Sequence, residues 1–111
     1  MTDSEIYYTS ATKQAELIQK KIISPVELIH IYLDRIQSLN PSLNAIVTVS
    51  EKAIEQAHQA ETAVMKGEQL GKLHGVPFTA KDCFDTAGIK TTRGSRLFQH
   101  RIPDQDATAV K

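Results

Sequence analysis

Apolar residues recur every three or four positions through much of the first 66 residues. This spacing places them on one face of an α-helix. It predicts three helices, at about residues 11–21, 25–39 and 51–66. The predicted apolar faces consist of Ala15, Leu17, Ile18 and Ile22 in the first helix, of Leu28, Ile29, Tyr32, Leu33, Ile36 and Leu39 in the second, and of Ala53, Ile54, Ala57, Ala60, Ala63 and Val64 in the third.

The ends of these helices carry local signals. Ser24 can cap the second helix, Pro25 suits its first position, and Glu27 completes a capping box. We expect this helix to end before Asn40-Pro41, because proline cannot donate a backbone hydrogen bond. Gly67 is expected to close the third helix, since glycine adopts the left-handed conformation common at helix ends.

Two short apolar runs lack the helical period and are predicted to be strands. Ala45 to Val49 is rich in β-branched residues, and the run from Val76 to Ala80 leads directly into Lys81-Asp82. Strands are therefore expected at 45–49 and 76–81. Residues 104–111 have the pattern of a helix start with Asp104 or Asp106 as the cap, and residues 1–9 form a polar lead.

Lys81, at the end of an apolar run, has two interpretations. Lysine is uncommon in strands, so its presence at the end of this predicted strand requires an explanation. It can be a charge that protects an edge strand from pairing with other chains. It can also be a desolvated amine that takes part in proton transfer, because burial favours the uncharged form of lysine.

Composition narrows the function classes. The chain has 111 residues, 41% hydrophobic and 23% charged, with a formal net charge of zero. These values are ordinary for a soluble globular domain, and the scattered basic residues give no footprint for nucleic acid. The only cysteine, Cys83, excludes a disulfide or a zinc cluster within the chain. We find no signal peptide, membrane span, metal motif or cofactor motif, and the predicted location is the cytoplasm.

Several separated motifs resemble those of the amidase signature family, in the order in which that family has them. The resemblance covers about residues 10–111 and rests on S-P-V-E-L (24–28), N-P-S-L-N-A-I-V (40–47), L-H-G-V-P (73–77), K-D (81–82), D-T-A-G (85–88), T-T-R-G-S (91–95) and D-A-T-A-V (106–110).

Enzymes of this family hydrolyse or transfer amides with a serine–cis-serine–lysine triad, and the resemblance implies that Lys81 is the lysine. The two serines of the family lie in a later loop of the G-G-S-S-G type. This sequence contains neither a Ser-Ser nor a Gly-Gly pair. The resemblance therefore implies the amino-terminal part of the amidase signature fold over residues 10–111. This is an α/β fold with helices followed by strands of a mixed sheet, incomplete as it stands.

The implied function is hydrolysis of the carbon–nitrogen bond of a small carboxylic amide, without a cofactor and with Lys81 as the catalytic residue. The chain alone is expected to be inactive and to associate with the missing carboxy-terminal portion. One alternative is a non-catalytic truncated or complementing interaction module. Within the enzyme class, the alternative is the A subunit of a glutamine-dependent tRNA amidotransferase, although the motifs of residues 85–95 look closer to a generic amidase.

Three further residues could be considered for chemistry, and each is interpreted as structural. Cys83 is expected to be a half-buried small hydrophobic residue. Ser95 lacks the second glycine of a nucleophile elbow and is expected in a turn. His74 is expected to be a hydrogen-bonded loop residue rather than an acid or base.

Overall fold

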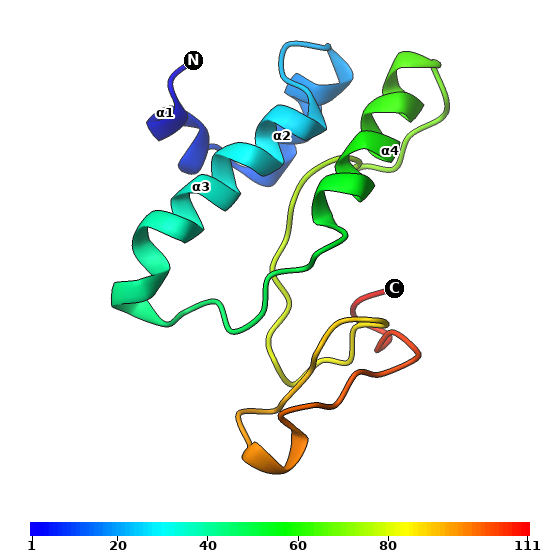
Figure 1. Cartoon of the computed structure of the whole chain (residues 1–111). Helices are drawn as coiled ribbons and strands as arrows, with labels where there is room; N and C mark the ends of the chain where they lie inside the picture. Colours follow the sequence, from blue (N-terminus) through cyan, green and yellow to red (C-terminus); the bar gives the residue numbers. More distant parts are fainter. The chain divides into compact units, whose positions relative to one another are not determined.

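The computed structural model describes all 111 residues and contains four α-helices and one short 3₁₀-helix (Figure 1). These elements are α1 (Asp3–Tyr7), α2 (Ala11–Gln19), α3 (Pro25–Leu43), α4 (Ala53–Met65) and η1 (Arg96–Phe98). The chain divides into two compact units. The helical unit comprises Met1–Ala45 and Glu51–Pro77, and the loop unit comprises Ile46–Ser50 and Phe78–Lys111. All four α-helices belong to the helical unit.

The three predicted helices are confirmed as α2, α3 and α4. The capping box of α3 forms as expected. The Glu27 N–H donates to Ser24 Oγ at 3.0 Å, and the Ser24 N–H donates to the Glu27 carboxylate at 3.3 Å. Two donors at the helix start are thereby satisfied.

The predicted end of α3 was wrong, because the helix continues through Pro41 to Leu43. A proline in the last turn removes only one backbone donor. The helix stops instead at Asn44, which has a φ of 49° and donates its N–H to the Asn40 carbonyl at 2.7 Å. Asparagine is one of the few residue types that tolerate this left-handed conformation.

Helix α4 ends as predicted at Gly67, which has a φ of 69°. The Gly67 N–H donates to the Val64 carbonyl and the Glu68 N–H donates to the Ala63 carbonyl, both at 3.1 Å. This pair of bonds is a Schellman motif, which satisfies the last carbonyls of the helix.

Helix α1 lies inside residues 1–9, the predicted polar lead. It begins with a capping box in which the Glu5 N–H donates to Thr2 Oγ1 and the Thr2 N–H donates to the Glu5 carboxylate. Ile6 on this helix is only 4% exposed and joins the core. The T-x-x-E spacing ahead of an apolar residue was the signal that could have revealed α1.

The hydrophobic core lies in the helical unit, where α3 packs against α4. Ile18 and Leu28 at its centre are completely buried. Ile22 was predicted on the apolar face of the first helix but is 65% exposed, because α2 ends before it. The buried hydrophobic residues are Ile6, Ala15, Leu17, Ile18, Leu28, Ala57 and Val64.

The predicted strands at 45–49 and 76–81 are absent from the structure, and no mixed sheet forms. Both segments are irregular, and the only β-pairing is an isolated antiparallel bridge between Thr86 and Ile89. A strand persists only where a neighbouring strand accepts its backbone hydrogen bonds. The local pattern was typical of strands, but these 111 residues form no ladder for it to join.

The predicted helix start at 104–111 is reduced to a turn, in which the Lys111 N–H donates to the Ala107 carbonyl at 3.2 Å. Asp106 does not cap this turn. Its carboxylate accepts a hydrogen bond from the Ala87 N–H at 2.7 Å instead. None of the helices combines the length and apolar character that crossing a membrane requires.

Candidate active site

Lys81 lies in the loop unit, in a turn rather than at the end of a strand. Its carbonyl accepts a hydrogen bond from the Phe84 N–H at 2.9 Å. The lysine side chain is exposed, as are the residues just before it, with Phe78 at 73% exposure. The site therefore presents its amine on the surface of this unit.

Asp82 connects this turn to the loop at residues 92–94. Its carboxylate accepts hydrogen bonds from the Thr92 hydroxyl, from the Thr92 N–H at 2.8 Å and from the Gly94 N–H at 3.4 Å. Its backbone carbonyl accepts another from the Arg93 N–H at 2.8 Å. The hydroxyl of Thr92, together with the two backbone N–H groups, lowers the pKa of the Asp82 carboxyl below its ordinary value.

Asp85 anchors the other end of the same turn. Its two carboxylate oxygens accept from the two terminal nitrogens of Arg101 at 2.7 and 2.8 Å, in a half-buried bidentate pair. The hydrogen bonds from Arg101 hold the pKa of Asp85 below its ordinary value. The Asp85 carbonyl also accepts from the Ala107 N–H at 2.8 Å.

Backbone bonds complete this cluster around Thr91, which is only 2% exposed. The Thr91 N–H donates to the Arg101 carbonyl at 3.0 Å, and the Gly88 N–H donates to the Pro103 carbonyl at 2.9 Å. The motifs K-D, D-T-A-G and T-T-R-G-S thus come together in space. Sequence reasoning noted these motifs but missed the pairing of Asp82 with Thr92 and of Asp85 with Arg101.

The three remaining candidates are His74, Ser95 and Cys83. His74 and Ser95 make structural hydrogen bonds, and Cys83 is not buried. His74 Nε2 donates to the Ala60 carbonyl at 2.9 Å, which confirms a hydrogen-bonded loop histidine. Ser95 Oγ accepts from the Leu97 N–H at 3.2 Å and caps η1, so its structural role is confirmed. Cys83 is exposed, so its predicted burial was wrong: it lies in a surface turn of the loop unit, outside the hydrophobic core.

A shallow depression of about 350 Å³ lies beside the Asp82–Thr92 contact. Thr92, Gly94 and Ser95 contribute to its wall, and Lys90 and Arg96 bring positive charge to it. Its other lining residues are Val47, Thr48 and Gln99.

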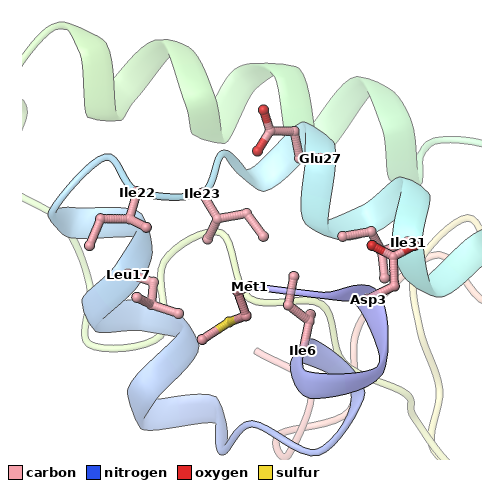
Figure 2. Close-up of a pocket in the computed structure, with 8 residues that line it drawn as sticks. All are labelled: Met1, Asp3, Ile6, Leu17, Ile22, Ile23, Glu27 and Ile31. Atoms are coloured by element: carbon pink, nitrogen blue, oxygen red, sulfur yellow. The ribbon is translucent and has the colours of Figure 1, made fainter.

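A larger cavity of about 410 Å³ lies in the helical unit, and Figure 2 shows the side chains that face it. Most are apolar, and of its two acidic residues Glu27 already serves the capping box of α3. No serine, cysteine, lysine or histidine lines this cavity. Its lining residues are Met1, Asp3, Ile6, Leu17, Ile22, Ile23, Glu27 and Ile31.

Comparison with known proteins places this arrangement in a family. The family model Amidase matches residues 27–111. The chain belongs to the amidase signature family. A bacterial aryl acylamidase of that family is similar in structure, with a TM-score of 0.72 and 33% sequence identity, covering 91% of this chain and 21% of the acylamidase.

Curated relatives of this amidase-family chain include two bacterial proteins, each named as the A subunit of glutamyl-tRNA(Gln) amidotransferase. The one from Carboxydothermus hydrogenoformans is 41% identical over 108 residues. The one from Bdellovibrio bacteriovorus is 36% identical over 106 residues. Each match covers 96% of this chain and 22% of the relative, so the chain spans about a fifth of the length of these relatives.

Proposed function

We propose that residues 10–111 form the amino-terminal part of an amidase domain. In the complete domain, Lys81 is the general base for cleavage of an amide bond. The observation that carries this proposal is the Lys81-Asp82 pair, held by hydrogen bonds among the family's motifs. The two serines of the triad belong to a G-G-S-S-G type loop, and this sequence has no such loop.

In the proposed reaction, an uncharged Lys81 accepts a proton that the nucleophilic serine passes through the bridging serine. The serine oxygen attacks the carbonyl carbon, the carbon–nitrogen bond breaks, and Lys81 returns the proton to the leaving amine. Water or another acceptor then attacks the resulting ester, takes the acyl group and releases the serine hydroxyl. Both proton transfers require Lys81 to cycle between its neutral and charged forms.

The exposure of Lys81 and Phe78 supports this role. An amine must meet the serines to act on them, and an accessible surface allows that contact. Closing the serine loop over the turn would bury the amine, and burial favours its neutral form. The carboxylate of Asp82 forms no ion pair with the amine and bonds to Thr92 and Gly94 instead.

Within the family, the relatives favour the amidotransferase alternative over a generic amidase. Several are named as the A subunit of glutamyl-tRNA(Gln) amidotransferase, and one of them is 41% identical over 96% of this chain. We therefore propose that the whole enzyme uses glutamine as its amide donor. We also propose that it acts together with partner subunits in the cytoplasm. Anilides such as an aryl acylamidase would cleave are the second candidate substrates, supported by the structural match.

The test is a chimera in which this chain replaces the matching segment of the Carboxydothermus hydrogenoformans relative. We expect the chimera to release ammonia from glutamine. Lys81→Arg should lower its turnover by about 100-fold or more, because arginine has similar size and charge but cannot be deprotonated in proteins. A parallel assay with a chromogenic anilide distinguishes the two substrate classes.

Two controls make this experiment decisive. Lys72→Arg makes the same change on an exposed lysine of the helical unit that lines neither cavity, and it should leave turnover near the unaltered value. The 111-residue chain alone should be inactive, since triad residues act as a unit. A folded but inactive chimera would favour the non-catalytic interaction module, whereas near-normal turnover of Lys81→Arg would show that Lys81 takes no part in the chemistry.

A further inference from the structure

We propose that Asp82 is a positioning residue that holds Lys81 in place for catalysis; this inference rests on the proposed function. Four hydrogen bonds link Asp82 to residues 92–94, three through its carboxylate and one through its backbone carbonyl. No strand ladder holds this segment. The hydrogen bonds of Asp82 therefore fix this segment, as ladder hydrogen bonds fix a strand within a sheet.

The position of Asp82 next to Lys81 makes this contact relevant to the chemistry. The two Cα atoms are about 3.8 Å apart across a planar peptide bond, so fixing Asp82 also fixes where the lysine stem begins. Displacing a catalytic group by about 1 Å can cost roughly 100-fold in rate. A loose Asp82 would let the amine drift from the serine by such amounts.

Asp82 is suited to this role and unsuited to proton transfer. Its carboxylate already accepts from the Thr92 hydroxyl, the Thr92 N–H and the Gly94 N–H. These donors stabilise the ionised form, which lowers the pKa of Asp82. A carboxylate that is ionised and engaged in this way is an anchor for a loop.

Asp106 provides a matched control in the same unit. Its carboxylate also accepts a backbone hydrogen bond, from the Ala87 N–H at 2.7 Å, but it makes no bond to residues 92–94, which hold Asp82. Asp82→Asn and Asp106→Asn make the same chemical change. Each replaces one carboxylate oxygen by an NH2 group, which donates hydrogen bonds and cannot accept one.

The experiment measures kcat and KM for glutamine in the chimera described above. Asp82→Asn should lower kcat by about 10- to 100-fold and leave KM within about twofold, while Asp106→Asn should leave kcat near the unaltered value. The double variant Lys81→Arg with Asp82→Asn should be no slower than Lys81→Arg alone. Losses that act through one residue are not additive once that residue is replaced.

The outcomes separate this inference from the proposed function. If Lys81→Arg is slow but Asp82→Asn keeps its kcat, the positioning role is wrong and the proposed function stands. If the losses in the double variant multiply, Asp82 supports only the fold, and the inference is again wrong. Near-normal kcat for Lys81→Arg contradicts the proposed function itself.

A second pair of variants covers the case in which Asp82→Asn does not fold. Thr92→Val removes the hydroxyl that donates to Asp82 and keeps the backbone N–H, whereas Thr92→Ser keeps both donors. We expect Thr92→Val to lower kcat by about tenfold and Thr92→Ser to retain it. Equal kcat values for these two variants would overturn the positioning role.

Discussion

Gly75, in the loop after α4, lies directly against the helical core. It has a φ of 79°, and a Cβ placed there would lie 2.8 Å from Cγ of Pro25 and 3.2 Å from Cδ1 of Ile18. Ile18 is completely buried, so it has little room to move away. Two physical costs, backbone strain and overpacking, thus meet at one position.

We expect Gly75→Ala to lower the free energy of unfolding by about 2–4 kcal/mol, the sum of left-handed strain and core overpacking. Two glycines separate these causes. Gly67 has a φ of 69° with open space around it, so Gly67→Ala should cost only about 1 kcal/mol. Gly71 has neither constraint, and Gly71→Ala should be neutral or slightly stabilising.

Urea denaturation of the 111-residue chain, followed by far-ultraviolet circular dichroism, measures all three variants. Gly71→Ala should be the most stable of the three variants, Gly67→Ala intermediate and Gly75→Ala the least stable. Equal losses for Gly67→Ala and Gly75→Ala would show that close packing against Pro25 and Ile18 contributes nothing.

At the scale of elements, α2 ends in a Schellman motif that lacks the usual glycine. The Ile22 N–H donates to the Leu17 carbonyl and the Lys21 N–H donates to the Ile18 carbonyl, both at 2.9 Å. Lys21, at the left-handed position, has a φ of 58°. A side chain in this conformation costs about 1 kcal/mol or more, which glycine avoids.

Lys21→Gly is therefore expected to stabilise the chain by about 0.5–1 kcal/mol, although glycine also gains freedom in the unfolded state. Lys20→Gly is the matched control. Lys20 has a φ of −80° and forms an exposed ion pair with Glu16, so glycine there should instead destabilise the chain by about 0.5–2 kcal/mol. Thermal unfolding midpoints of the two variants should move in opposite directions, and a fall for Lys21→Gly would contradict the strain argument.

At the scale of the whole molecule, the two units are stabilised by different interactions. All buried hydrophobic residues of the core lie in the helical unit. The buried residues of the loop unit are Thr91 and Pro103, and this unit is held by the carboxylates of Asp82, Asp85 and Asp106. Burial of apolar surface does not depend on protonation, whereas carboxylate hydrogen bonds do.

The loop unit should therefore lose its structure at a higher pH than the helical unit on acidification. Folding lowers the pKa of Asp82, through Thr92, and of Asp85, through Arg101, below the ordinary value of 3.8. The resulting stabilisation is fully present above about pH 4 and is lost as the pH falls through the folded-state values.

Amide resonances measured by NMR between about pH 6 and pH 2 test this order. Thr92 and Gly94 report on the loop unit, and Ile18 and Leu28 report on the core of the helical unit. The first pair should shift toward unfolded positions while the second pair keeps its native positions. In Asp82→Asn, the contribution of Asp82 to the acid step at Thr92 should be lost, while the contribution of the Asp85–Arg101 pair should remain. A simultaneous loss of all four native resonances would sink the prediction.

The local sequence determined those features that depend on a few neighbouring residues. Apolar spacing predicted α2, α3 and α4, the Ser24–Glu27 pair predicted the start of α3, and Gly67 predicted the end of α4. The motifs around Lys81 indicated the amidase signature family, which the comparisons confirm. Helices and caps satisfy their own backbone groups, so short stretches of sequence suffice to predict them.

Tertiary structure alone decided the features that depend on distant partners. The runs at 45–49 and 76–81 have the composition of strands but form none, because a strand needs a second strand to accept its hydrogen bonds. Lys81 is the immediate neighbour of Asp82 in the sequence, yet the fold brings the more distant Thr92 to the carboxylate of Asp82. Such contacts depend on how the chain closes its loops, which no local pattern encodes.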